Sequence, residues 1–287
     1  MQPLINANLV LEGGALRGMF TAGVLDALDE KDLLFEYIIG VSAGACMAVS
    51  YVTRQRGRNR EILQRFGRDH RYFSIRNILR EGNLFSASFV YEEIPQKLIP
   101  FDYRTFEESP VRFTAVATDC ATGQAIYLNN KKEMTPAIRA SASMPFVSKP
   151  VPLNGQLLLD GGIADSIPIE HARREGHAKS VVVLTRPKGY LKKPVGNVAL
   201  FKRVLKSYPA LAEAMYNRAA MYNRELAVLE ELEAAGQSLI VYPPPEIKVG
   251  RLERNWQKLD TLYQAGRQAG QELAQKLPGF LAQVSGC

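Results

Sequence analysis

Residues 40–44 of the chain read Gly-Val-Ser-Ala-Gly and decide the fold, because they join an apolar run to a series of helix-forming residues, 43–51. This pattern is typical of a nucleophile elbow, in which a strand turns sharply into a helix and presents a serine hydroxyl at the helix N-terminus. Gly40 and Gly44 leave room for the tight turn and for a substrate beside the backbone. The free N–H groups at the start of the helix would stabilise an alkoxide. We therefore expect Ser42 to be a catalytic nucleophile.

The part of the chain that precedes Ser42 is short and holds one strand and one helix. We expect a strand over residues 8–11, a glycine-rich loop over 13–18 and an amphipathic helix over 19–28, before the second strand at 37–39. The elbow of an α/β-hydrolase comes after several strands, so the sequence excludes that fold. The loop and the elbow both follow strands, and ligands bind at that edge of an open parallel sheet.

The glycine-rich loop is suited to form an oxyanion hole, because its backbone N–H groups would lie beside the serine. It consists of Gly13, Gly14, Ala15, Leu16, Arg17 and Gly18. Its spacing matches neither the dinucleotide-binding pattern nor a phosphate-binding loop that ends in Lys-Ser or Lys-Thr. Arg17 falls in the first turn of the helix, where a cation opposes the helix dipole. An anion beside Arg17 would explain its position, and a surface salt bridge is the alternative.

The candidates for the base that activates Ser42 are aspartates and histidines that follow it in the chain. His171 and His177 follow Asp160, so the order of a Ser-Asp-His triad is formally available. However, His171 falls in an expected helix and His177 in a connection, where histidines are usually solvated. Asp160 ends an expected strand and precedes two glycines. Partial burial there would raise the pKa of the carboxyl and make it a better base, although an Asp-Gly-Gly turn is the alternative.

Three blocks of the sequence together resemble the signature of the patatin-like phospholipases. They are residues 13–18 (GGALRG), 40–44 (GVSAG) and 160–162 (DGG). Residues 117–123 and 140–145 are also similar to that family, and the resemblance covers residues 8 to about 190. It implies a dyad of Ser42 and Asp160 without a histidine, an oxyanion hole in the glycine-rich loop with Arg17 nearby, and hydrolysis of the acyl esters of lipids. The family as a whole does not fix which lipid is the substrate.

The remaining pattern predicts a single α/β domain over residues 1–287. Further strands are expected at 111–118, 125–128, 156–159, 180–184 and 238–242, with helices between most of them. This alternation predicts a three-layer α/β/α fold with a largely parallel central sheet. From about residue 196 we expect a C-terminal helical extension, with helices over 200–235, broken near Pro209, and over 251–277. Residues 188–195 are rich in Lys, Gly and Pro and are expected to form a mobile loop.

The sequence predicts no cofactor, no metal site and no membrane anchor. Cys46, Cys120 and Cys287 form neither a disulfide framework nor a metal-binding pattern with histidine. The N-terminus lacks the pattern of a signal peptide, and the longest apolar run, residues 41–52, is too short to span a bilayer. We therefore expect a cytoplasmic protein.

Positive charge is concentrated in residues 54–80, where nine arginines accompany only two acidic residues. This local excess equals the formal net charge of the chain, +7. Apolar residues alternate with the arginines, as in segments that lie on an anionic bilayer, where each basic residue contributes about 1 kcal/mol. The alternative is a solvated arginine face over a buried apolar one. Our candidates for membrane contact are Arg54, Arg56, Arg58 and Arg60. No recognition motif accompanies the charge, so we expect no nucleic acid partner.

Together these features predict a serine lipid acyl hydrolase of the phospholipase A or lysophospholipase type, with a phospholipid or another acyl-ester lipid as substrate. Ser42 would attack the ester, Asp160 would take its proton, and the glycine-rich loop would hold the oxyanion. An acyltransferase or a general carboxylesterase would use the same two residues. A non-catalytic membrane protein that binds lipid would need neither of them.

Overall fold

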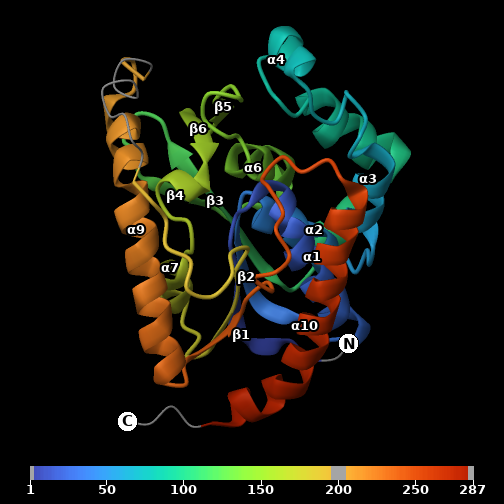
Figure 1. Ribbon diagram of the computed structural model, residues 1–287, viewed down its shortest axis with the longest axis vertical. Coiled ribbons are helices and arrows are strands. Elements are labelled where there is room, and N and C mark those ends of the chain that lie inside the picture. The colour runs from blue at the N-terminus through green and yellow to red at the C-terminus, as the bar shows by residue number, and fades with distance from the viewer. Residues whose placement is uncertain (1–2, 195–204, 284–287) are drawn as a thin grey trace.

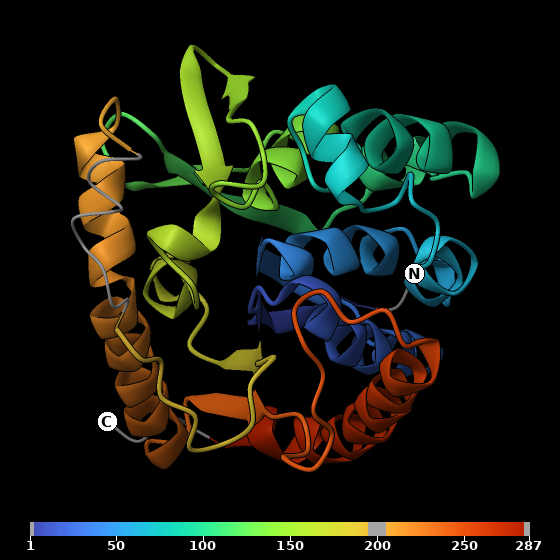
Figure 2. The same cartoon turned by 45° about the horizontal axis from the view of Figure 1, so that its top comes forward.

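A mixed sheet with helices on both faces forms the centre of the protein (Figures 1 and 2). The computed structural model describes residues 3–194 and 205–283, and within these ranges the sheet has eight strands. They are β1 (Ile5–Leu11), β2 (Phe35–Val41), β3 (Arg112–Asp119), β4 (Ala125–Leu128), β5 (Val151–Leu153), β6 (Gln156–Asp160), β7 (Ser180–Val183) and β8 (Ser238–Val241). Their order across the sheet is β5-β6-β3-β2-β1-β7-β8, and β4 pairs with β3.

The centre of the sheet is parallel and buried on both faces. Strands β3, β2, β1, β7 and β8 are parallel, whereas β4 and β6 run antiparallel to β3, and β5 runs antiparallel to β6. Near-continuous apolar runs suit such strands: Val181 and Val183 of β7 enter one core and Val182 enters the other. The predicted α/β fold is thus confirmed. Strand β5 was not predicted, because three residues that include Pro152 give no strand signal.

Helices cover the sheet in two layers. They are α1 (Gly18–Glu30), α2 (Ala43–Val52), α3 (Arg58–Phe66), α4 (Ile75–Glu81), α5 (Tyr103–Glu108), α6 (Met134–Ser141), α7 (Ile169–Arg174), α9 (Pro209–Ala234) and α10 (Trp256–Ala282). Helices α1, α2 and α10 cover one face, and α7 and α9 cover the other (Figure 2). Short 3-10 turns occupy Ala15–Arg17, Lys131–Glu133 and Gly161–Ile163, and a π-helical segment occupies Phe89–Leu98.

The C-terminal part is built into the same sheet and is more than the predicted helical extension. Strand β8 pairs with β7, and α10 lies along α1. A Cβ added to Gly266 of α10 would come within 2.1 Å of the Phe20 carbonyl oxygen, so the two helices need a glycine at their contact. The break predicted near Pro209 is the start of α9. Residues 195–204, which include the start of the predicted helix and the end of the predicted mobile loop, lie outside the described residues.

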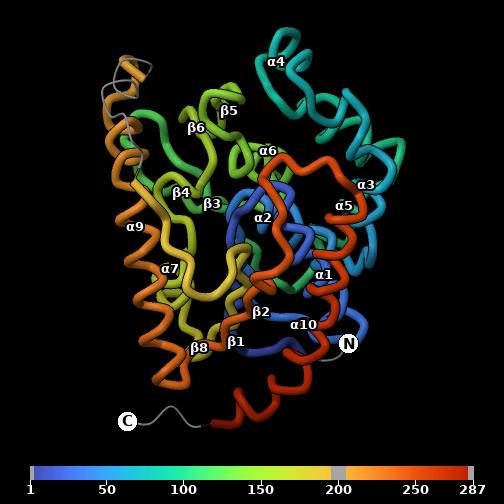
Figure 3. Tube along the Cα trace, in the orientation of Figure 1, coloured from blue at the N-terminus to red at the C-terminus, as the bar shows by residue number. Residues whose placement is uncertain are grey.

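A mainly helical region, residues 53–111, connects α2 to β3 and lies at one end of the molecule. Within it, α4 projects from the body of the protein (Figures 1 and 3). Within the described ranges, we find no helix that is both long enough and apolar enough to cross a bilayer.

Candidate active site

Ser42 lies at the sharp turn between β2 and α2. Its φ of 53° and ψ of −119° are unusual for a residue with a side chain, and α2 begins directly after it. The flanking glycines are required by close packing: a Cβ on Gly40 would come within 2.6 Å of the Ala45 nitrogen, and one on Gly44 within 2.3 Å of the Leu11 carbonyl oxygen. Strained backbone of this kind is typical of functional sites. The predicted elbow geometry is therefore present at Ser42.

Asp160 lies at the end of β6 and its side chain reaches Ser42. Its carboxylate accepts a hydrogen bond from the Gly162 nitrogen at 2.8 Å. It also interacts with the Ser42 hydroxyl closely enough for the hydroxyl to lower the pKa of the carboxyl. Burial raises the pKa of Asp160, and it outweighs the positive charge of Arg218 and these two interactions, which lower it. The carboxyl is thus a stronger base than an exposed aspartate, in contact with the hydroxyl that it would have to deprotonate.

The C-terminal end of α6 and the residues directly after it hold Ser42 and Asp160 in position. The hydroxyl of Ser141, which is fully buried, accepts a hydrogen bond from the Ser42 nitrogen at 2.8 Å. The carbonyl oxygen of Ser143 accepts a hydrogen bond from the Asp160 nitrogen, also at 2.8 Å. No role for Ser141 was predicted from the sequence. Its only signal was that residues 140–145 belong to the stretches that resemble the family.

The glycine-rich loop follows β1 and lies against the elbow. A Cβ on Gly13 would meet the Ser42 Cβ at 3.0 Å, which places the loop in contact with the serine. The Leu16 nitrogen donates to the Arg251 carbonyl oxygen at 3.1 Å, and the Arg17 nitrogen donates to the Gly14 carbonyl oxygen at 3.2 Å. These two N–H groups are therefore occupied. Gly18 begins α1, and its nitrogen bonds to the carbonyl oxygens of Ala15 and Leu16.

The free N–H groups of the loop are those nearer its start. Among the described residues, the nitrogens of Gly13, Gly14 and Ala15 have no hydrogen-bond acceptor. Ala15 also has a positive φ of 49°, so the backbone reverses at this point. This narrows the predicted oxyanion donors from six residues to these three.

Neither histidine considered as a base lies at the site. The ring of His171 stacks on Tyr127, with 3.6 Å between the ring centroids. His177 precedes β7 at the amino end of the parallel strands, the edge opposite the elbow, and its Nδ1 lies 2.6 Å from Asn6 Oδ1. The arrangement favours Asp160 over either histidine.

An apolar cavity opens beside Ser42 on the side of α2 and α3. Its walls include Met19 of α1, Met47 of α2 and Ile138 of α6. Tyr72 and Phe85, which flank α4 in the sequence, also line it. We call this hollow the apolar cavity. An aliphatic chain placed in it would be removed from water with its reacting end at the serine.

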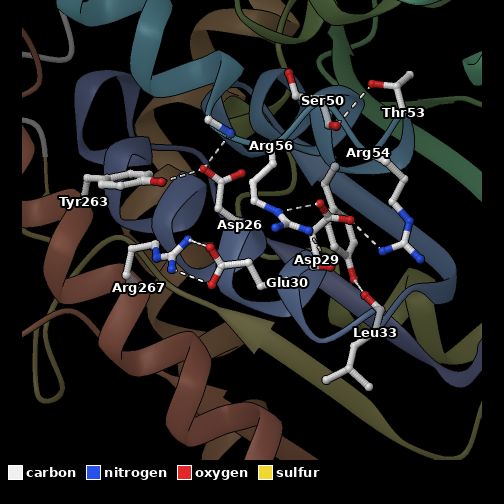
Figure 4. Close-up of polar contacts among 12 residues, drawn as sticks. Asp26, Asp29, Glu30, Leu33, Ser50, Thr53, Arg54, Arg56, Tyr263 and Arg267 are labelled. Atoms are coloured by element: carbon white, nitrogen blue, oxygen red, sulfur yellow. Dashed lines mark hydrogen bonds and ion pairs between the residues drawn. The ribbon is translucent and has the colours of Figure 1, made fainter.

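The side chains of Arg54 and Arg56 form ion pairs within the protein. Both bind the buried carboxylate of Asp29, through Arg54 Nη1 at 2.6 Å and Arg56 Nε at 3.1 Å (Figure 4). Next to them, the Gly57 nitrogen donates to Asp26 Oδ2 at 3.1 Å. Their charge therefore stabilises the start of α3 against the end of α1.

Arg58 and Arg60 also have contacts inside the fold. Arg58 is buried, stacks on Phe101 and donates to the Ile99 carbonyl oxygen at 3.0 Å, so the prediction that it faces a membrane is wrong. Arg60 Nε pairs with Asp260 of α10 at 2.6 Å. The four predicted arginines thus do not form one free basic face, because carboxylates distant in sequence neutralise three of them.

Metal ligands and a reactive thiol are not found where the structure can be described. Within residues 3–194 and 205–283, no group of three or more His, Cys, Asp or Glu side chains could hold a metal ion. Burial raises the pKa of the Cys46 thiol, which lies one turn after Ser42, to about 12. Cys46 is therefore a packing residue and not a competing nucleophile.

The chain belongs to the patatin-like phospholipase family, whose model matches residues 9–173. That range contains the glycine-rich loop, Ser42 and Asp160. A second model, a domain of unknown function called DUF6363, matches residues 208–282, which hold α9, β8 and α10.

Several curated proteins are similar to this chain. The uncharacterized protein YjjU of Escherichia coli is 28% identical over 272 residues, which cover 91% of this chain and 75% of YjjU. An uncharacterized NTE family protein of Mycobacterium tuberculosis is 30% identical over 168 residues, 56% of this chain and 44% of that protein. The lysophospholipase nte1 of Emericella nidulans is 25% identical and covers 94% of this chain, which spans 18% of its length.

Solved structures also match along most of the chain. VipD from Legionella pneumophila is 13% identical with a TM-score of 0.40, and the match covers 93% of this chain and 67% of VipD. ExoU of Pseudomonas aeruginosa, in complex with SpcU, is 14% identical with a TM-score of 0.40, over 98% of this chain and 53% of ExoU.

Proposed function

We propose that this protein is a serine lipid acyl hydrolase of the phospholipase A or lysophospholipase type. The observation that carries the proposal is the placement of the buried Asp160 carboxylate beside the hydroxyl of Ser42, which lies at a strained elbow and lines the apolar cavity. Membership of the patatin-like phospholipase family supports it.

The reaction proceeds in two steps. Ser42 Oγ bonds to the ester carbonyl carbon while Asp160 takes the hydroxyl proton, and the alcohol leaves with that proton as the tetrahedral intermediate collapses. A water molecule then attacks the acyl-serine, again with Asp160 as base, and releases the fatty acid. The N–H groups of Gly13, Gly14 and Ala15 stabilise the oxyanion in both steps, and each such donor typically contributes a few kcal/mol to lowering the barrier.

An acyltransferase or a general carboxylesterase on the same dyad is the second candidate. The apolar lining of the cavity favours a substrate with an aliphatic chain over a small ester, because an aliphatic chain is stabilised by burial. The acyl acceptor distinguishes the hydrolase from the acyltransferase. Hydrolysis releases free fatty acid, whereas transfer to an added alcohol yields a new ester.

A non-catalytic protein that binds membrane lipid is the remaining alternative. A fluorophosphonate probe reacts only with an activated serine, so labelling tests this alternative directly. We expect the native protein to be labelled at Ser42 and to release fatty acid from a panel of acyl-ester lipids. Absence of both would contradict the proposed function.

We further propose that α4 brings the site to a lipid surface. The exposed fractions of Ile75 and Leu79, one turn apart, are 74% and 84%, and Arg76 and Arg80 lie beside them on the same helix. The buried Asn77 fixes the inner side of α4 by donating to the carbonyl oxygen of Leu84 at 3.2 Å. Apolar side chains beside cations suit the interface of an anionic bilayer. The proposal of peripheral membrane contact thus moves from the arginines of residues 54–60 to α4.

A further inference from the structure

Five basic side chains gather on the Asp160 side of the active site. They are Arg17, Arg186, Lys192, Arg218 and Arg251. Among the described residues none of them has a carboxylate within ion-pair distance, whereas Arg54, Arg56 and Arg60 are all paired. The Nε atoms of Arg17 and Arg218 are buried and have no hydrogen-bond acceptor in the described part of the chain. Buried cations without a counterion are costly, and an anion beside them would offset that cost.

Three of these residues line a hollow with a volume of about 370 Å³, whose walls also include Tyr190 and Met215. We call it the basic pocket; its cations are Lys192, Lys193, Arg218 and Arg251. It lies beside α9, which Figure 3 shows along the side of the sheet away from α2 and α3. The apolar cavity and the basic pocket thus lie on opposite sides of the reacting residues.

Two contacts connect the basic pocket to the reacting residues. A Cβ on Gly162 would lie 3.0 Å from Arg218 Nη2 and 3.1 Å from Asp160 Oδ1, so the guanidinium approaches the catalytic carboxylate. On the other side, the Arg251 carbonyl oxygen accepts a hydrogen bond from the Leu16 nitrogen in the glycine-rich loop. The basic pocket therefore lies next to the position that the ester would occupy at Ser42.

The charge of this region is not balanced within the described protein. The buried carboxylates nearby are Glu12, Asp160 and Glu225. Glu12 already accepts hydrogen bonds from Thr185 N at 2.6 Å, Thr185 Oγ1 at 3.0 Å and the Tyr222 hydroxyl at 2.9 Å. Burial, and then the charge of Arg218, lower the pKa of Lys192 to about 7. An anion in the pocket would reverse this effect, because it would favour the charged form of the lysine.

We propose that the basic pocket binds a phosphate group on the alcohol side of the substrate, so that the enzyme selects acyl esters of phosphate-bearing alcohols, such as lysophospholipids. Several cations converge there, and the planar guanidinium donates two parallel hydrogen bonds to phosphate oxygens. With the acyl chain in the apolar cavity and the phosphate in the basic pocket, the ester carbonyl lies at Ser42. This inference rests on the proposed hydrolase function. Arg218 and Arg251 belong to the part matched by DUF6363, outside the patatin match.

The test compares two lipids that differ only in the phosphate. Lysophosphatidic acid and monoacylglycerol with the same oleoyl chain are presented in the same neutral detergent micelles, and kcat/KM is measured for each with the full-length protein. We expect the native enzyme to prefer lysophosphatidic acid, and the double variant Lys192→Gln/Arg251→Gln to lower the ratio of the two kcat/KM values at least tenfold. Lys192→Arg, which keeps the charge, should retain the ratio. Arg224→Gln removes an exposed cation from the same helix α9 and should also leave the ratio unchanged.

Equal rates of the native enzyme on the two lipids, or an unchanged ratio in the folded double variant, would overturn the proposal. Inhibition by inorganic phosphate together with equal rates on the two lipids would overturn the assignment to the substrate, because the pocket would then hold free phosphate. Failure of the hydrolase function would appear differently, as no hydrolysis of either lipid and no fluorophosphonate labelling of Ser42. In that case calorimetry with glycerol 3-phosphate decides on the pocket: binding that the double variant loses supports it, and no binding to the native protein overturns it.

Discussion

Replacing Ser141 by alanine tests whether the hydrogen bond to the elbow maintains the reacting geometry. The Ser141 hydroxyl accepts the Ser42 N–H at 2.8 Å in a fully buried position, so the variant leaves that N–H without an acceptor. A buried unsatisfied donor costs about 1–3 kcal/mol. If this cost falls on the transition state, in which the elbow must hold its strained conformation, kcat/KM falls by about 5-fold to 150-fold.

Ser143→Ala is the matched control for this prediction. Ser143 lies two residues further along the same turn, and its hydroxyl donates to the Arg139 carbonyl oxygen at 2.7 Å without contacting Ser42. Hydrolysis of a soluble p-nitrophenyl ester is measured for both variants, and their unfolding is followed by circular dichroism. We expect both to lose stability and only Ser141→Ala to lose kcat/KM beyond about twofold. Equal rates in the two variants would show that the Ser141 hydrogen bond does not position the nucleophile.

Three further predictions concern the cavity, α4 and a buried carboxyl pair. Met47→Trp should narrow the apolar cavity and exclude two methylenes of the acyl chain, each of which contributes about 0.8 kcal/mol when buried. The preference for decanoyl over octanoyl esters should therefore fall about tenfold. An unchanged chain-length profile would show that the acyl chain lies elsewhere. Ile75→Asp/Leu79→Asp should reduce sedimentation with anionic vesicles and spare a soluble ester, whereas Tyr216→Asp, on α9, should not; equal vesicle binding would refute the role of α4. Burial and the neighbouring Asp165 raise the pKa of Glu225, so the folded protein keeps a proton that the unfolded chain releases. The free energy of unfolding of the protein, measured by urea unfolding, should therefore fall as the pH rises from about 5 to 9, and Glu225→Gln should make this fall smaller. Parallel pH curves for the native protein and the variant would contradict this prediction.

The fold and the elbow were predictable because their signals are local. Apolar runs of strand length identified all the parallel strands, and the glycines around Ser42 identified the turn. Asp160 was predictable from its place at a strand end and from the resemblance of residues 160–162 to the family, although 117 residues separate it from Ser42. The hydrogen bond from Ser141 was not predictable, because nothing in the local sequence indicates which serine of residues 140–145 faces the elbow.

The ion-pair partners of the arginines could not be predicted from the sequence, because these partners are distant along the chain. The partners of Arg54 and Arg60, Asp29 and Asp260, lie 25 and 200 residues away. Conversely, nothing in the helical pattern of residues 209–234 distinguishes Arg218, which approaches the Asp160 carboxylate, from Arg224, which faces solvent. Local composition therefore indicated a basic face on residues 54–60, whereas a cluster of cations without ion-pair partners among the described residues lies beside the proposed active site.

The most direct measurement of the central claim is fluorophosphonate labelling, read by peptide mass spectrometry, of native protein, Ser42→Ala and Asp160→Asn. We predict that the native protein is modified on Ser42 alone and that both folded variants lose labelling and ester hydrolysis together, because one removes the nucleophile and the other its base. Modification of another residue, or undiminished labelling of Ser42 in the folded Asp160→Asn variant, would contradict the account.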